Sequence, residues 1–392
     1  MTEKELKLLA CELGCINVFR GVLLKKEVKN LLDFLRSEED LYEKLSLYGE
    51  FVHSLSGRAF SEILCRYVCE DENAYITSVA EKKEISSAFE ENLEAELRLF
   101  SRLTEITPAD LCKSLDYQGF IPQFDNSPVD FSAIYQDRVK NISRYGYGIF
   151  ASAGMFRVED GEIVPVEAAD TVCLESFIGY EDERQKIIDN TQALIDGRPA
   201  LNALLCGDAG TGKSSTVKAV ANRFFSEGVR LIEVRKDQLF ALSHIMGRIA
   251  GNPLKFIIFI DDLSFNKNDD CFSMLKAALE GSTSAKASNA VIYATSNRRH
   301  IVKEKFSERG HEDDIHHSDT VQELLSLSDR FGLTVYFSRP GKDLYLDIVH
   351  QLMERYGIEG DLKETDIKAE TFALARGSRS PRAAEQFVKS LI

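Results

Sequence analysis

One eight-residue run of this chain has the residue types and spacing of a phosphate-binding loop. It begins at Gly207 and ends in Gly212, Lys213 and Ser214, with four residues between the two glycines. Glycines let the backbone turn tightly, so that successive N–H groups point at a polyphosphate, and a helix N-terminus adds partial positive charge. Lys213 would reach the β- and γ-phosphates, and the Ser214 hydroxyl would bind Mg²⁺. The expected contacts are Gly207, Asp208, Ala209, Gly210, Thr211, Gly212, Lys213 and Ser214, followed by Ser215.

The flanking residues supply the strand and the helix that such a loop requires. Residues 202–206 are a short, largely apolar run that predicts a buried strand. Residues 214–225 place Val217, Val220 and Phe224 at the spacing of an amphipathic helix. A chance glycine turn would not have both neighbours, so we expect the chain to bind a nucleoside triphosphate.

A second apolar run, residues 256–260, ends in the two carboxylates Asp261 and Asp262. In a P-loop fold this strand lies beside the phosphate loop, so Asp261 would hold the Mg²⁺ shell. Asp262 would lie closer to the γ-phosphate and could orient or deprotonate the attacking water. The expected cofactors are therefore ATP and Mg²⁺.

Strands and helices alternate around these motifs. The candidate strands are 203–206, 230–234, 256–261, 290–295 and 333–337. Each pair is separated by enough residues for a crossover helix, which is the pattern of a parallel sheet covered on both faces. We expect an α/β core of five parallel strands over residues 176–338, with a helical lid over 339–392.

The residues before this core divide into two parts. Residues 1–120 read as a helical domain, with helix starts at Ser37 and at Thr107, where Pro108 takes the first helical position. Residues 121–175 read as a linker that contains a β-hairpin turning at residues 159–162.

Composition restricts the partners and the location. The net charge of −15 comes mainly from residues 1–175, which hold 19 Lys and Arg against 32 Asp and Glu. An acidic front half is unsuited to duplex DNA and suits an unknown protein partner better. No run is long enough to span a membrane, and the N-terminus lacks the apolar segment of a signal peptide, so we expect a cytoplasmic protein.

The order of motifs resembles that of the AAA+ ATPases. Residues 207–214 and 256–262 correspond to Walker A and Walker B, and Ile178 and Gly179 precede them where this superfamily packs the adenine. The resemblance implies sensor 1 at Asn297, an arginine finger at Arg330 and sensor 2 at Arg382. It covers roughly residues 145–392 and implies a homo-oligomer, because an arginine finger completes the site of a neighbouring subunit.

Within the superfamily, the chain is most similar to a family of uncharacterised bacterial AAA+ proteins described as predicted ATPases. Residues 145–150, 261–265 and 294–300 carry this similarity. One departure is Asp262, because most AAA+ members have Glu there. The shorter side chain sets the carboxylate back by roughly an ångström, and water positioning is sensitive to such shifts, so slow hydrolysis is expected. Glu280, just before Gly281, is a less favoured substitute for Asp262 as the base.

Arg382 has a physical interpretation besides the resemblance. Ser380 as N-cap and Pro381 at the first helical position put Arg382 in a first turn, where the helix dipole disfavours a cation. A phosphate facing Arg382 would explain its place there. The alternative for Arg382 is a solvated side chain. The alternative for Arg330 is a structural ion pair with Asp329 or another acid.

Two other clusters of possible metal ligands do not have the features of a metal site. Cys11, Cys15, Cys65 and Cys69 have the i,i+4 spacing of cysteines in helices and not the shorter spacing of zinc knuckles. The histidines between residues 300 and 317 lie in a polar segment that reads as a solvated insertion.

Together these features predict an AAA+ ATPase that hydrolyses ATP to drive conformational change in an oligomer. Two alternatives remain: a low-turnover ATP-binding switch or scaffold, and a DNA-associated motor or loader.

Overall fold

The structure, a computed structural model, describes residues 1–113, 115, 117, 119–168, 170–263, 274–276, 279, 288–297 and 330–392. It divides into two compact units, Met1–Ser152 and Ala153–Ile392. No helix in the described residues is both long and apolar enough to cross a bilayer.

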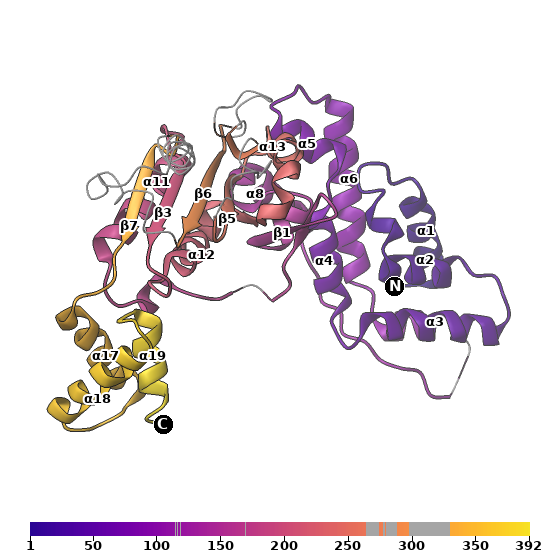
Figure 1. The fold of residues 1–392 in the computed structure, drawn as a ribbon. Helices are drawn as coiled ribbons and strands as arrows, with labels where there is room; N and C mark the ends of the chain where they lie inside the picture. The colour runs from indigo at the N-terminus through magenta and orange to yellow at the C-terminus, as the bar shows by residue number, and fades with distance from the viewer. Residues whose placement is uncertain are drawn as a thin grey trace. The chain divides into compact units, whose positions relative to one another are not determined.

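The first unit is helical (Figure 1). Its core is built from aromatic side chains such as Phe19, Phe51, Phe100 and Phe131, which take part in edge-to-face ring contacts. Its helices are α1 (Glu3–Gly14), α2 (Lys26–Arg36), α3 (Leu41–Leu55), α4 (Phe60–Glu70), α5 (Ala74–Ala80), α6 (Ser87–Thr104), α7 (Pro108–Cys112), α8 (Phe131–Lys140), α9 (Ile142–Tyr145) and α10 (Ile149–Ser152).

The two predicted helix starts in this unit have different outcomes. Thr107 caps α7 in a capping box with Asp110, with Pro108 at the first position, so that prediction is confirmed. The start at Ser37 is wrong, because Ser37 ends α2 and Asp40 caps α3. The acidic run after Ser37 has the composition of a first turn, but the side chain that reaches the free N–H group of Glu43 belongs to Asp40.

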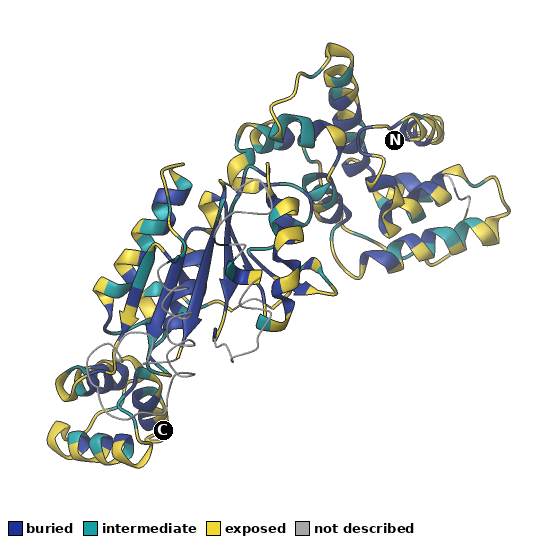
Figure 2. Ribbon diagram, turned by 45° about the horizontal axis from the view of Figure 1, so that its top comes forward, coloured by how far each residue is buried: buried dark blue, intermediate teal, exposed yellow. Residues whose placement is uncertain are grey.

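The second unit is built on a seven-stranded sheet in the order β2-β1-β4-β5-β6-β3-β7. All pairs are parallel except β1 with β2. The inner strands are buried along their length, as Figure 2 shows in dark blue. The strands are β1 (Met155–Glu159), β2 (Glu162–Pro165), β3 (Ala203–Gly207), β4 (Val229–Glu233), β5 (Lys255–Ile260), β6 (Ala290–Ser296) and β7 (Leu333–Phe337).

Among the described residues the sheet has seven strands, whereas the sequence predicted five. All five predicted strands are present as β3 to β7, and the predicted hairpin is also present. However, β1 pairs in parallel with β4 and so extends the sheet. Residues 121–152 fall in the helical unit, and the hairpin falls in the sheet, whereas the sequence suggested one linker over 121–175.

Successive strands of this sheet are connected through helices α11 (Glu181–Ile195), α12 (Lys213–Arg223) and α13 (Leu242–Ile249). After β7 the chain forms α17 (Lys342–Tyr356), α18 (Leu362–Ala375) and α19 (Pro381–Lys389). These three helices have a hydrophobic core of their own, centred on Tyr345, Ile348 and Phe387. Helices predicted after residue 339 are therefore present, and we call α17–α19 the lid.

Candidate nucleotide site

The loop between β3 and α12 has a positive φ at three glycines, Gly207, Gly210 and Gly212, and two of them lie close to other elements. Gly207 has φ +143°, and a Cβ there would lie 2.1 Å from the carbonyl oxygen of Phe337. Gly210 has φ +78°, and a Cβ there would lie 3.1 Å from Ser380 Oγ. The loop therefore lies directly against the end of β7 on one side and against the lid on the other.

Lys213 opens α12 and is only 4% exposed. Its ammonium group donates to the carbonyl oxygens of Gly207 (3.0 Å) and Asp208 (2.7 Å), so it lies folded over the loop. Burial lowers the pKa of Lys213, and the nearby carboxylates, Asp208 first, oppose this effect. A cation held at this place, beside the N-terminus of a helix, suits a polyphosphate.

The structure places the Ser214 hydroxyl against the first of the two carboxylates. Ser214 Oγ donates to Asp261 Oδ1 over 2.6 Å, and Thr295 Oγ1 donates to the same oxygen over 2.6 Å. The three residues come from α12 and from the ends of the adjacent strands β5 and β6. Hydroxyl and carboxylate oxygens are the ligands that Mg²⁺ prefers, so this donor set fits the cation.

Asp262 has different surroundings from Asp261. It has φ +51°, a left-handed conformation that is unusual outside glycine. Its N–H group donates to Thr295 Oγ1, and its carboxylate accepts a 2.7 Å hydrogen bond from the Asn297 amide. Asp262 and Asn297 are both exposed. Asp262, expected to orient the water, and Asn297, expected as sensor 1, thus lie together.

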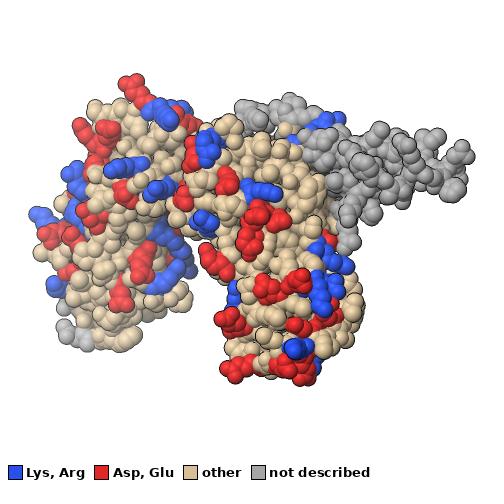
Figure 3. Space-filling view, turned by 90° about the vertical axis from the view of Figure 1, so that its left-hand side faces the viewer, with Lys and Arg blue, Asp and Glu red and all other residues tan. Residues whose placement is uncertain are grey.

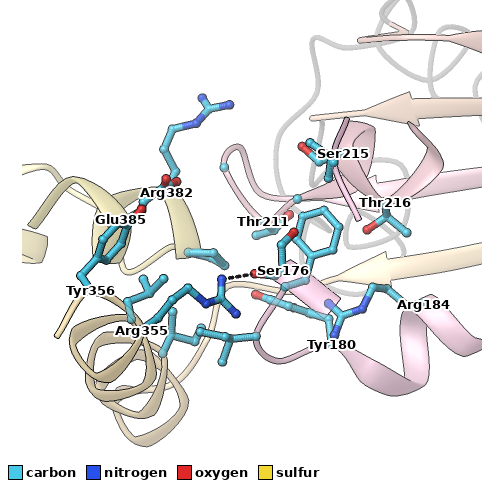
Figure 4. A pocket seen from close by; sticks show the side chains of 18 residues that line it. Ser176, Tyr180, Arg184, Thr211, Ser215, Thr216, Arg355, Tyr356, Arg382 and Glu385 are labelled. Carbon is cyan, nitrogen blue, oxygen red and sulfur yellow. Dashed lines mark hydrogen bonds between the residues drawn. The ribbon is translucent and has the colours of Figure 1, made fainter. Parts of the chain in front are cut away.

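A cavity of about 400 Å³ continues from the loop toward the lid. This volume is in the range of small-molecule sites. Its lining includes Ile178, Tyr180, Thr211, Ser215, Arg355 and Tyr356, which come from the core and from the lid (Figure 4). Ile178 also packs against the hydrophobic core of the lid, and Gly179 has φ +74° with an added Cβ 3.2 Å from Leu344.

Arg382 lies where the sequence placed it, in the first turn of α19. Ser380 Oγ accepts from the N–H of Ala383, and Pro381 follows as the first helical residue. The backbone N–H of Arg382 donates to the carbonyl oxygen of Gly210 over 3.3 Å. Its side chain extends away from Ser176, Tyr180 and Arg355 in Figure 4.

Four lining or bridging residues were not foreseen from the sequence. Burial raises the pKa of Tyr180, whose hydroxyl donates to the carbonyl oxygen of Ser338 over 2.6 Å. Arg339 donates its N–H to Asp208 Oδ2 over 3.0 Å. Arg355 and Tyr356 end α17 at the cavity. An arginine or tyrosine at a helix end carries no local signal, because only tertiary packing directs it into a cavity.

Arg330 lies just before β7, at the amino end of that strand. Ala203 pairs with Leu333 and Gly207 pairs with Phe337, so the phosphate loop is at the carboxyl end. The two places are separated by five extended residues, about 17 Å. Asp329, Glu280 and the histidine-rich segment lie outside the described residues. Within the described part of the chain, no three His, Cys, Asp or Glu residues form a metal-binding group.

The described residues thus combine a parallel sheet, a glycine-rich loop after an inner strand, acidic residues at the end of a nearby strand and a set of C-terminal helices. The chain belongs to the family described as "Protein of unknown function (DUF815)", which matches residues 151–392. This match bears out the resemblance to a family of uncharacterised proteins.

Comparison with solved structures gives distant matches. The RuvB Holliday junction branch migration motor of Thermotoga maritima is 17% identical over 56% of this chain and 63% of that chain, with a TM-score of 0.37. A variant of the same motor, with one arginine replaced by alanine, is 16% identical over 55% and 63%, with a TM-score of 0.38. A chain from a study of katanin self-assembly is 18% identical over 55% and 69%, with a TM-score of 0.34. The match spans less than two thirds of the RuvB chains. No curated protein sequence matches the chain.

Proposed function

We propose that this chain is an ATP hydrolase that binds ATP with Mg²⁺ and uses turnover to drive conformational change in an oligomer. The observation that carries the proposal is the 2.6 Å contact between Ser214 Oγ and Asp261 Oδ1 next to the buried ammonium of Lys213. A cation-binding pair and a fixed positive charge at one glycine loop are the parts that phosphoryl transfer requires.

Each residue has a task in this proposal. Lys213 exchanges its two carbonyl partners for phosphate oxygens, and Ser214 with Asp261 holds the cation. When bound there, Mg²⁺ would neutralise part of the charge of the phosphates. Asp262 accepts a proton from, or orients, the attacking water, and Asn297 fixes the position of the Asp262 carboxylate.

The location of Arg330 supports an oligomer. An arginine about 17 Å along the sheet from its own phosphate loop is too far away to stabilise charge there. If a neighbouring subunit docked the amino end of its β7 against the open side of this phosphate loop, its Arg330 would reach the γ-phosphate as an arginine finger.

The partner of such an oligomer is proposed to be a protein that contacts the acidic helical unit. On the face drawn in Figure 3, Lys and Arg side chains are interspersed with Asp and Glu. A protein surface of mixed or positive charge is a better match to this distribution than a nucleic-acid duplex, which requires gathered cations. Affinity capture with a variant that retains ATP would identify the partner.

A low-turnover switch is the second candidate, and Asp262 favours it. The Asp262 carboxylate is already held by Asn297 over 2.7 Å, and it is one methylene shorter than a glutamate. A shorter, tethered base reaches the water less well, so binding would outlast hydrolysis.

Steady-state phosphate release separates these candidates. We expect Mg²⁺-dependent release by the parent, loss of release with EDTA, and no change when duplex or single-stranded DNA is added. ATP binding without release would indicate the switch. A large stimulation by DNA would indicate the DNA-associated motor, and absence of both binding and release would refute the proposal.

A further inference from the structure

A short irregular segment, residues 173–179, contributes Ser176, Phe177 and Ile178 to the lining of the cavity. Leu174–Ser176 form a single 3₁₀ turn, in which Ser176 N–H donates to Cys173 and Phe177 N–H donates to Leu174. A single turn with so few backbone hydrogen bonds does not hold its own position, because isolated turns are unstable in water.

Arg355, in the last turn of lid helix α17, supplies a contact to this segment. One terminal nitrogen of its guanidinium donates to the carbonyl oxygen of Ser176 over 2.6 Å, and the other donates to that of Glu175 over 3.4 Å (Figure 4). The planar fork of arginine suits two neighbouring acceptors, whereas a lysine ammonium acts as a point charge.

Apolar contacts continue along the same face of α17. Gly179 lies against Leu344, and Ile178 packs on the lid core that contains Ile348. Leu344, Ile348 and Arg355 are separated by four and seven residues, so they lie on one stripe of the helix. The segment 175–179 is therefore held by apolar packing at one end and by Arg355 at the other, and the Arg184 guanidinium lies over the Phe177 ring between them, 5.5 Å from the ring centroid.

We propose that Arg355 is a positioning residue for the nucleoside half of this site. By holding the carbonyl groups of Glu175 and Ser176, it fixes residues 177–179 beside the cavity, so that recognition of the nucleoside requires core and lid together. The inference rests on the proposed nucleotide function, and it assigns Arg355 no contact with the phosphates.

Hydrogen exchange in the nucleotide-free protein tests the positioning directly. Arg355→Ala should speed exchange in peptides covering residues 174–179 by about tenfold and leave residues 207–214 unchanged, since hydrogen bonds to a charged group are lost only in that segment. The matched control is Arg376→Ala, which removes a lid guanidinium that stacks on Phe372. Unchanged exchange at residues 174–179, or an equal rise at residues 207–214, would overturn the proposal.

Competition binding tests the consequence for the ligand. Arg355→Ala should weaken ATP about tenfold and leave inorganic tripolyphosphate unchanged, because tripolyphosphate has no nucleoside. Arg355→Lys should recover part of the ATP affinity, and Arg376→Ala should match the parent. Equal weakening of ATP and tripolyphosphate would mean that Arg355 acts on the phosphates and would refute the assignment. If the parent binds neither ligand, the proposed function fails, while the exchange experiment still decides the role of Arg355.

Discussion

At the residue scale, two neighbouring carboxylates have unequal surroundings. One oxygen of Asp261 accepts hydrogen bonds from Ser214, Thr295 and the N–H of Asp262. The carboxylate of Asp262 accepts from Asn297 at the edge of the site. A carboxylate oxygen that accepts several hydrogen bonds is held in one orientation, which suits a cation ligand. The less engaged carboxylate, Asp262, suits contact with a water.

This inequality predicts different defects for the two positions. Asp262→Asn should bind ATP like the parent but release phosphate at least 100-fold more slowly, because general-base catalysis contributes about 10²–10⁴ in rate. Asp262→Glu should raise the rate by restoring reach. Single-turnover assays with radiolabelled ATP measure both.

Asp261→Asn is the control, and it should lose the response to Mg²⁺. If Asp262→Asn turns over like the parent, another residue orients the water, and Glu280 would be the next residue to test.

At the scale of elements, the phosphate loop is fitted against the end of β7. Gly207→Ala combines a backbone angle that favours glycine with a Cβ placed 2.1 Å from the carbonyl oxygen of Phe337. We expect a loss of about 3 kcal/mol in the free energy of unfolding. Gly197→Ala is matched to it, because Gly197 also has a positive φ (+70°) but has open space around its Cβ position, and it should cost about 1 kcal/mol. Urea unfolding compares the two, and equal losses would contradict the tight fit.

The elements that local pattern alone defines could be predicted from the sequence. The apolar run 256–260 became β5, and Ser380 with Pro381 became the start of α19. The pairing of β1 with β4 could not be predicted, because the sequence of a strand does not specify which strand it pairs with. The phosphate loop could be predicted because its motif is local, whereas the role of Arg355 could not be predicted. The task of Arg355 exists only once α17 lies beside residues 175–178.

For the whole molecule, the proposed arginine finger requires a second copy of the chain. Arg330→Ala should bind ATP normally and hydrolyse it about 10³-fold more slowly, because a trans arginine stabilises charge only on the transferred phosphoryl group. Mixing Arg330→Ala with Lys213→Ala should restore part of the activity, since the second variant binds no nucleotide but keeps its arginine. Light scattering with ATP present gives the oligomeric state. A strictly monomeric, ATP-bound and active protein would leave Arg330 with a structural role.

Equilibrium titration with a fluorescent ATP analogue tests directly whether the loop at residues 207–214 binds a nucleoside triphosphate. Lys213→Ala removes the buried cation that donates to the Gly207 and Asp208 carbonyl groups. The matched control is Lys218→Ala, on the same helix, whose ammonium lies 3.5 Å from Glu233. The account predicts saturable, Mg²⁺-dependent binding by the parent and by Lys218→Ala, and no measurable binding by Lys213→Ala. Equal binding by Lys213→Ala and the parent would contradict it.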